Sequence, residues 1–290
     1  MRFFFNAVLF VFSLQLILAS NPNYKQTAPP LKKMKLVWSD EFNYKGKPNE
    51  AFWCFEEGFV RNNELQWYQS DNAFCKKGVL VIEARRENKP NPNYDASSDD
   101  WRKSRKTIDY SSACIVTKNK VAFQYGTLVV RARIDVDKGS WPAIWTLGVQ
   151  GEWPANGEID LMEFYRINNQ PHILANTAWA DNKRFKAQWN SVKMPLQNFE
   201  AKNRNWGSKF HEWRMDWTAD YIKMYLDGVH IHTTELNKVH NLLGDSTIHP
   251  FRQPHFFLLN LAVGSNGGDP SQTSFPLKYE VDYIRFYQPN

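Results

Sequence analysis

The chain has 290 residues, a length that suits one large all-β domain or two small ones. Hydrophobic residues make up 42% of it and charged residues 23%, both ordinary values for a globular domain. The formal net charge of +6 comes from scattered basic residues, without a basic helix or a recognised nucleic-acid-binding module. We therefore exclude nucleic acid as a partner.

The first 20 residues have the features of a secretory signal peptide: a basic residue at position 2, a short apolar run and small residues at the end. The run is too short and too early for a membrane span. Residues 21–34 are polar and rich in proline, and we expect a disordered lead-in there. The protein is thus predicted to be a secreted or periplasmic monomer with no membrane attachment after signal removal.

The mature chain contains three cysteines, Cys54, Cys75 and Cys114. An exported chain can form disulfides, but an odd number leaves at least one thiol without a partner in the same chain. Their spacing matches no metal-binding motif. Three unpaired, buried small hydrophobic residues are the simplest interpretation.

From Leu36 onward, short runs of β-branched and aromatic residues alternate with clusters of Gly, Asn, Asp and Pro, which is typical of an all-β protein. There is no βαβ alternation and no dividing linker, so residues 35–290 are predicted to form one domain of two packed antiparallel sheets. Long surface connections are expected over 88–106 and 182–208. The expected strands are Lys35–Phe42, Leu65–Gln69, Val79–Ala84, Ser112–Thr117, Tyr125–Ile134, Ala143–Leu147, Glu158–Phe164, Ile173–Trp179, His211–Trp217, Tyr221–Leu226, Val229–His232, His255–Ala262 and Tyr279–Tyr287. Asp227-Gly228 predicts a tight hairpin.

One short apolar run carries three carboxylates, Glu158, Asp160 and Glu163. Side chains alternate between the two faces of a strand, so Glu158 and Asp160 share a face. Strict alternation would send Glu163 to the core face, which is costly for a carboxylate. One extra residue restores the phase, and we place this β-bulge at Leu161-Met162. All three carboxylates then line one face of the strand.

This carboxylate row matches the requirements of glycoside hydrolysis, which uses two carboxylic groups that flank the scissile bond. Retaining enzymes hold the two groups roughly 5–5.5 Å apart, so that one attacks while the other donates a proton. Glu158 and Glu163 have long side chains that can lean together above Asp160. Like charges at close range raise one pKa and keep one group protonated near neutral pH. The alternative is an ordinary solvated strand face.

Motifs in a characteristic order extend over nearly the whole mature chain. They are Trp38–Phe42, Asn63–Tyr68, Gly78–Arg85, Tyr125-Gly126, Trp141–Trp145, Trp153–Glu158, Leu259–Gly264 and Val281–Tyr287. Together they make the chain resemble glycoside hydrolase family 16, of the laminarinase (endo-β-1,3-glucanase) type. The resemblance implies a β-sandwich jelly roll of the concanavalin A-like lectin/glucanase architecture, whose two curved antiparallel sheets form a concave substrate cleft.

The same resemblance implies roles for the carboxylate row: Glu158 as nucleophile, Glu163 as general acid/base and Asp160 as the assisting carboxylate. It implies an endo-acting enzyme that retains anomeric configuration through a covalent glycosyl-enzyme intermediate and needs no cofactor for catalysis. The expected substrate is a polysaccharide, most simply a β-glucan with internal β-1,3 or mixed β-1,3/1,4 linkages.

Substrate contacts are expected from aromatic and polar side chains around the row. Trp141 and Trp145 lie on one strand face and suit a stacking platform for sugar rings, with core packing as the alternative. Trp179 closes the strand after the carboxylate row and is expected to face the cleft. Positions where the family contacts sugar hydroxyls are matched by Asn62, Glu64 and Arg85, although Glu64 also suits a structural charge.

Family members often hold a structural calcium ion, and hard cations take several oxygen ligands. The matching positions are Glu41, the carbonyl group of Gly78, and Asp282. The sequence also departs from the family. Asn176 stands in the strand where laminarinases often carry a histidine, and residues 264–270 lack the usual tryptophan.

These departures leave alternatives open. One is the same mechanism on an algal galactan, as in agarases and porphyranases, with the basic loop around Arg102 and Arg105 meeting sulfate groups. Another is a non-catalytic glucan-binding, lectin-like protein, although a binding module has no need of a paired acid and nucleophile. A transglycosylase would use the same pair of glutamates.

Overall fold

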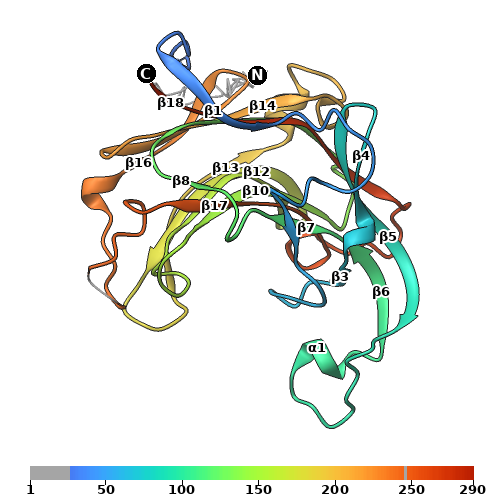
Figure 1. The fold of residues 1–290 in the computed structure, drawn as a ribbon. Helices are drawn as coiled ribbons and strands as arrows, with labels where there is room; N and C mark the ends of the chain where they lie inside the picture. Colours follow the sequence, from blue (N-terminus) through green and yellow to red (C-terminus); the bar gives the residue numbers. More distant parts are fainter. Residues whose placement is uncertain (1–26, 245–246) are drawn as a thin grey trace, which may run out of the picture.

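The computed structural model describes residues 27–244 and 247–290, which form two β-sheets packed face to face (Figure 1). The predicted all-β jelly-roll sandwich is confirmed. One sheet has ten strands, in the order β16-β15-β14-β9-β18-β5-β6-β3, with β1 paired to β18 and β4 paired to β5. Its strands are β1 (Met34–Asp40), β3 (Gln66–Tyr68), β4 (Ala73–Lys76), β5 (Val79–Pro90), β6 (Thr107–Ser112), β9 (Gly126–Ile134), β14 (His211–Trp217), β15 (Tyr221–Leu226), β16 (Val229–Glu235) and β18 (Leu277–Pro289).

The second sheet has eight strands in the order β13-β12-β11-β10-β17-β7-β2, with β8 paired to β17. Its strands are β2 (Cys54–Phe55), β7 (Cys114–Val116), β8 (Ala122–Phe123), β10 (Ser140–Gly148), β11 (Glu158–Ile167), β12 (Gln170–Ala180), β13 (Ala187–Pro195) and β17 (His255–Val263). Among the described residues, helical structure is limited to α1 (Trp101–Ser104), α2 (Gln197–Glu200) and four 3₁₀ turns, Ser70–Asn72, Trp206–Ser208, Leu236–Lys238 and Ser265–Gly267.

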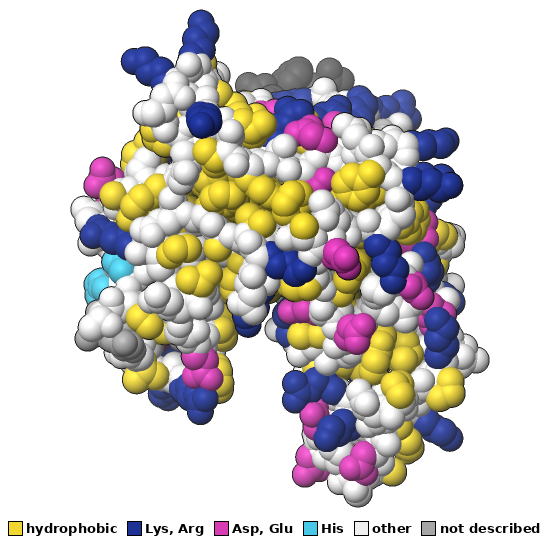
Figure 2. Space-filling view, in the orientation of Figure 1, with side chains coloured by type: hydrophobic (Ala, Val, Ile, Leu, Met, Phe, Trp, Pro, Cys, Tyr) yellow, Lys and Arg dark blue, Asp and Glu magenta, His cyan; other side chains and the backbone are white. Residues whose placement is uncertain are grey.

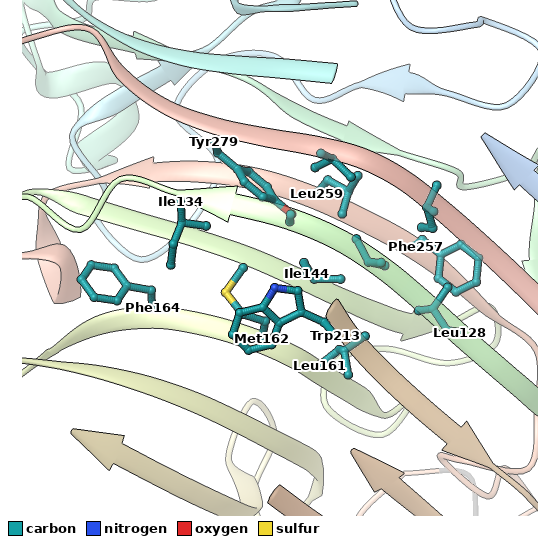
Figure 3. Packing of buried hydrophobic residues seen from close by; sticks show 14 of the residues in the cluster. Leu128, Ile134, Ile144, Leu161, Met162, Phe164, Trp213, Phe257, Leu259 and Tyr279 are labelled. Carbon is teal, nitrogen blue, oxygen red and sulfur yellow. The ribbon is translucent and has the colours of Figure 1, made fainter. Parts of the chain in front are cut away.

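The core lies between the two sheets, where their inward-facing side chains meet (Figure 3). Phe164 from β11 and Leu259 from β17 join Trp213 from β14 and Tyr279 from β18 in one cluster, and none of the four is more than 1% exposed. Full burial of a leucine or phenylalanine side chain contributes about 1.5–3 kcal/mol. This packing fixes the inner face of β11 and leaves its outer face free to carry polar side chains.

Strand β11 contains the predicted β-bulge. Its register against β12 shifts between Asp160 and Glu163, so that Leu161 and Met162 together oppose Ala175. Leu161 and Met162 are 1% and 0% exposed and both belong to the core cluster. Two successive apolar side chains thus enter the core, and the carboxylates on either side of them emerge on the opposite face.

The predicted strands are all present with shifted ends, and the run predicted over 112–117 is divided between β6 and β7. The Asp227-Gly228 hairpin joins β15 to β16, with φ of 49° and 75° at its two residues. The sequence missed β13, which lies inside the connection predicted over 182–208. Strand β13 is the edge strand of its sheet, and its outward face reads Trp189, Ser191 and Lys193, so the apolar signal of a buried strand is weak.

The polar insertion over 88–106 is ordered rather than a plain surface loop. Strand β5 continues to Pro90, and α1 sits near the tip of an arm that projects beside the opening below the eight-stranded sheet (Figure 1). Arg105 anchors this arm by donating hydrogen bonds to the carbonyl groups of Asn63 (2.9 Å) and Glu64. The Arg105 guanidinium also lies 4.6 Å from the centre of the Trp101 ring.

The predicted disordered lead-in is wrong for residues 27–34. The Ala28 N–H donates to the Gly228 carbonyl at 2.8 Å, and β1 already begins within this stretch. Backbone pairing with the β15–β16 hairpin therefore orders a segment whose composition alone suggests disorder. Residues 1–26, which include the predicted signal peptide, lie outside the described part of the chain.

Two further findings concern the described residues. All three cysteines are free thiols; Cys75 and Cys114 are buried and Cys54 is partly exposed, close to the prediction of three unpaired small hydrophobic residues. In residues 27–244 and 247–290, no helix combines the length and the apolar character needed to cross a membrane.

Candidate active site

A cleft of about 930 Å³ crosses the outer face of the eight-stranded sheet. Figure 2 shows the molecule hollowed on this side between two projecting lobes. The cleft is lined by the whole carboxylate row and by aromatic and polar residues from five strands and their loops. The lining residues used below are Arg61, Asn62, Glu64, Trp141, Trp145, Leu147, Trp153, Glu158, Asp160, Glu163, Asn176, Phe185, Trp189, Ser191, Lys193 and Asn260.

The bulge in β11 brings Glu158, Asp160 and Glu163 to the cleft face together, as the sequence predicts. Asp160 lies between the two glutamates and is only 1% exposed, whereas Glu158 and Glu163 are partly open to the cleft. Core packing holds the other side of the strand. The two longer carboxylates can therefore reach a ligand in the cleft, while the aspartate cannot leave its place.

Two indole groups hold the glutamates from opposite ends of the row. The Trp153 Nε1 donates to Glu158 Oε2 at 2.5 Å, and the Trp141 Nε1 donates to Glu163 Oε1 at 3.1 Å. Both donors are neutral and can give only one proton each, so each indole orients one oxygen of its carboxylate without adding a charge.

Asn176 on β12 links the middle of the row to Glu163. Its Nδ2 donates to Asp160 Oδ2 at 3.1 Å and to Glu163 Oε2 at 2.8 Å. Asn176, which stands where laminarinases often carry a histidine, thus supplies both hydrogen bonds from an uncharged amide. It orients Asp160 and Glu163 without placing a positive charge beside them.

Burial is the largest cause of the raised pKa of each carboxylate in the row. It raises the pKa of Glu163 to about 7, with the nearby charge of Glu158 adding to the rise and the Trp141 hydrogen bond opposing it. Burial and then the charges of both glutamates raise the pKa of Asp160 well above its ordinary range. The pKa of Glu158 is also raised by burial, against the hydrogen bond from Trp153. At neutral pH the row can therefore hold a protonated acid beside an ionised carboxylate.

Trp141 and Trp145 both line the cleft, as predicted, but neither offers an open ring face. Their exposed fractions are 8% and 9%. Trp145 donates from Nε1 to Asn260 Oδ1 at 2.7 Å, and the Arg61 guanidinium lies 5.2 Å from the centre of its ring. These two indoles are largely buried and their N–H groups are bound to Glu163 and Asn260, an arrangement that the sequence cannot distinguish from a stacking platform.

Asn62 and Glu64 also lie at the cleft, with Glu64 only 2% exposed. The Glu64 carboxylate accepts hydrogen bonds from Asn62 (3.1 Å), Gln66 (2.6 Å) and the Tyr68 hydroxyl (3.4 Å). Burial raises its pKa. Glu64 therefore organises the loop before β3, and Asn62 is the more accessible of the two predicted contacts.

Two predicted substrate contacts are corrected. Trp179 follows Ala178, which pairs with Glu158 and shares its cleft face, so alternation turns the Trp179 ring into the core. That ring lies 6.3 Å from Phe251, edge to face. Arg85 belongs to the other sheet, where its guanidinium donates to Glu83 (3.0 and 3.1 Å) and lies outside the cleft lining.

The predicted calcium ligands do not fit a calcium site. Glu41 accepts two hydrogen bonds from Arg285, at 2.9 and 2.7 Å, and Asp282 pairs with Arg131. Both carboxylates are thus neutralised by guanidinium groups, and only the carbonyl group of Gly78 is left of the predicted set. Within the described residues, no cluster of three or more His, Cys, Asp or Glu side chains has metal-binding geometry.

The sequence alone does not reveal several residues that the structure brings to the cleft. Trp153 lies five residues before Glu158, and that spacing does not indicate the indole–carboxylate bond. Trp189 and Phe185 lie in a stretch that the sequence predicts to be a connection. The strand register across β11, β12 and β13 places Trp189 in line with the carboxylate row, and Phe185 lies in the loop before β13.

The chain belongs to glycosyl hydrolases family 16, whose model matches residues 62–285. It is 32% identical to a beta-glucanase from Rhodothermus marinus, over 88% of this chain and 85% of that relative. The family membership that the motifs implied is therefore confirmed.

Solved structures agree with this assignment. The laminarinase catalytic domain from Thermotoga maritima is 30% identical with a TM-score of 0.71, covering 89% of this chain and all of that one. A structure associated with endo-acting O-glycanases, which members of the human gut microbiota express to initiate mucin breakdown, is 33% identical with a TM-score of 0.77. That match covers 91% of this chain and 94% of the other.

Burial of the Glu163 carboxyl generates a stability prediction. Its pKa is about 7 in the folded state against an ordinary 4.5, so stability falls as pH rises from 4.5 to about 7. The neutral variant Glu163→Gln avoids this loss. We expect it to be about 1–3 kcal/mol more stable than the native protein at pH 8 and little different at pH 4.5. Urea denaturation at the two pH values measures the difference.

The matched control is Glu50→Gln, because Glu50 is exposed and outside the cleft. We expect that variant to unfold like the native protein at both pH values. A Glu163→Gln variant that is less stable than native at pH 8 would contradict the proposed burial cost.

Proposed function

We propose that the protein is a retaining endo-β-glucanase that hydrolyses internal β-1,3 or mixed β-1,3/1,4 linkages. The observation that carries this proposal is the pair of glutamates on the bulged strand β11, both aimed into one cleft and separated by a buried aspartate. Two partly accessible carboxyls with raised pKa values, one of them near neutrality, match the chemistry of glycoside hydrolysis.

In the proposed first step, Glu163 acts as the general acid. Its carboxyl proton passes to the glycosidic oxygen while the Glu158 carboxylate attacks the anomeric carbon, forming a glycosyl-enzyme ester and releasing the leaving chain. In the second step, the ionised Glu163 takes a proton from water, which displaces Glu158 from the anomeric carbon. The proton that Glu163 donates in the first step is regained from water in the second, so both glutamates return to their starting states.

The other contacts give each glutamate its role. The Trp153 indole favours the ionised form of Glu158, which suits a nucleophile. Asp160 sits between the glutamates as the assisting carboxylate, and its position is fixed by burial and by the amide of Asn176. No step requires a metal ion or an organic cofactor.

A glucan substrate is supported by the relatives, since the Rhodothermus marinus protein is a beta-glucanase and the Thermotoga maritima structure is a laminarinase domain. In the galactan alternative, the basic loop around Arg102 and Arg105 would bind sulfate groups, and the contacts of these two residues argue against it. Arg105 is bound to the carbonyls of Asn63 and Glu64, and Arg102 is paired with Asp100 at 2.8 Å. The lectin-like alternative does not account for the raised pKa of Glu163.

A second candidate is hydrolysis of a galactose-containing glycan by the same residues. It is favoured by the O-glycanase structure, whose TM-score of 0.77 exceeds the 0.71 of the laminarinase domain, and by Asn176 in place of the usual histidine. Export of the mature protein, which the N-terminal sequence supports, and a monomeric state are further parts of the proposal.

A substrate panel tests the proposed function. We expect the purified protein to release oligosaccharides from laminarin or mixed-linkage β-glucan, and Glu158→Gln to lose at least about 1,000-fold of that activity because the nucleophile is gone. Product linkages are assigned by mass spectrometry and NMR. Turnover confined to agarose, porphyran or mucin would replace the glucan assignment with the second candidate, and turnover that persists in Glu158→Gln would overturn the catalytic assignment.

The pH dependence of kcat/KM tests the assignment of Glu163. As a general acid it must be protonated, so activity should fall as pH rises through about 7. The Trp141 hydrogen bond lowers this pKa. Removing the donor in Trp141→Phe should therefore move the alkaline limb to higher pH, even if activity falls overall. An alkaline limb that stays in place would contradict the assignment.

A further inference from the structure

We propose that Trp189 and Phe185 form a distal carbohydrate-binding subsite, the β13 subsite, which holds a pyranose ring away from the point of cleavage and selects for longer chains. The inference rests on the proposed function, since it concerns the same polysaccharide. It adds a site that binds the polysaccharide at a distance from the carboxylate row.

The strand register places Trp189 in line with Glu158. Glu158 on β11 pairs with Ala178 on β12, and Ala178 pairs with Trp189 on β13. Directly paired residues share a face of the sheet, so all three point to the cleft. Neighbouring strands lie 4.7–4.9 Å apart, which puts Trp189 roughly 10 Å from Glu158 across the sheet.

The residue between them has a small side chain. Ala178 is fully buried beneath its neighbours and is not part of the cleft lining, so it does not project into the cleft between Glu158 and Trp189. Ser191, the next residue of β13 on this face, lies opposite Asn176 in the same way. Ser191 and the exposed Lys193 supply hydrogen-bond donors for sugar hydroxyls beside the indole.

Exposure distinguishes Trp189 from the other three tryptophans of the cleft. Trp189 is 50% exposed, whereas Trp153 is only partly exposed and Trp141 and Trp145 are 8% and 9% exposed. An indole left half open on a cleft floor offers a ring face to a ligand, and the C–H face of a pyranose is the complementary surface. Among these four tryptophans, Trp189 is the most exposed and therefore the best suited to stacking.

Phe185 lies near the end of the β12–β13 loop, lines the same cleft as Trp189 and is 55% exposed. The Arg184 guanidinium lies 4.7 Å from the centre of the Phe185 ring and donates to both Glu152 oxygens, at 3.0 and 2.8 Å. Glu152 immediately precedes Trp153, whose indole holds Glu158. The loop that carries the β13 subsite is therefore tied to the loop that positions the nucleophile.

The occupant of this surface is a sugar chain because the surface is continuous with the catalytic cleft. Phe185, Trp189, Ser191 and Lys193 line the same cavity as the carboxylate row. The pairing of Trp189 with Ala178 turns its ring to the cleft, away from the inter-sheet core. A polysaccharide that reaches Glu158 and continues along the groove must pass over β13.

The test compares Trp189→Ala with the native protein on laminarin, β-1,3-linked glucohexaose and β-1,3-linked glucotriose. We expect kcat/KM to fall about tenfold on the two longer substrates, mainly through KM, and less than twofold on the trisaccharide. Trp189→Phe, which keeps a ring, should restore most of the loss. Tyr94→Ala is the matched control, because Tyr94 is 44% exposed and outside the cleft. It should behave as native on all three substrates.

Equal losses on all three substrates, or no loss on the longer ones, would overturn the β13 subsite while leaving the proposed function standing. If the native protein cleaves no β-1,3-glucan, the β13 subsite can still be tested independently of the proposed function. The measurement is affinity electrophoresis in gels that contain laminarin, mixed-linkage glucan, agarose, porphyran or mucin. In the Glu158→Gln background, Trp189→Ala should then weaken retardation in the polysaccharide that binds. Unchanged retardation in every gel would overturn the subsite.

Discussion

The site depends on one constraint: three carboxylates in a six-residue stretch must all avoid the core. The bulge in β11 satisfies it by placing Leu161 and Met162 in the core in succession. Without that extra residue, the strand would bury Glu163 between the sheets or turn Leu161 outward. Either outcome would cost several kcal/mol through an unpaired buried carboxylate or lost apolar burial. Core packing and catalytic geometry are thus set by the same two residues.

The carboxylate row is held by neutral donors and not by cations. Two indoles and one amide orient the glutamates and the aspartate, and no salt bridge to these three carboxylates is found among the described residues. A nearby arginine in direct contact would lower the pKa values and remove the general acid at neutral pH. The raised pKa values mark stability that the fold gives up for function, a pattern common at catalytic sites.

The sequence predicted those features that depend on local alternation. The all-β fold, the bulge and the cleft position of the three carboxylates all follow from which residues are apolar and in what phase. What it could not predict depends on partners far along the chain. Trp179 faces the core because of its register against β11, and Glu41 is held by Arg285, which lies 244 residues later. Strand β13 was missed because an edge strand with one open face carries little apolar signal.

The central claim is that Glu158 and Glu163 act as nucleophile and acid/base in a double displacement. The most direct measurement is the anomeric configuration of the first product, followed by ¹H NMR during the initial minutes of hydrolysis, before mutarotation equilibrates the new reducing end. Because the proposed double displacement retains configuration, we expect the new reducing end released from a β-linked substrate to appear first as the β-anomer. Initial release of the α-anomer would indicate a single displacement by water and would rule out Glu158 as the nucleophile.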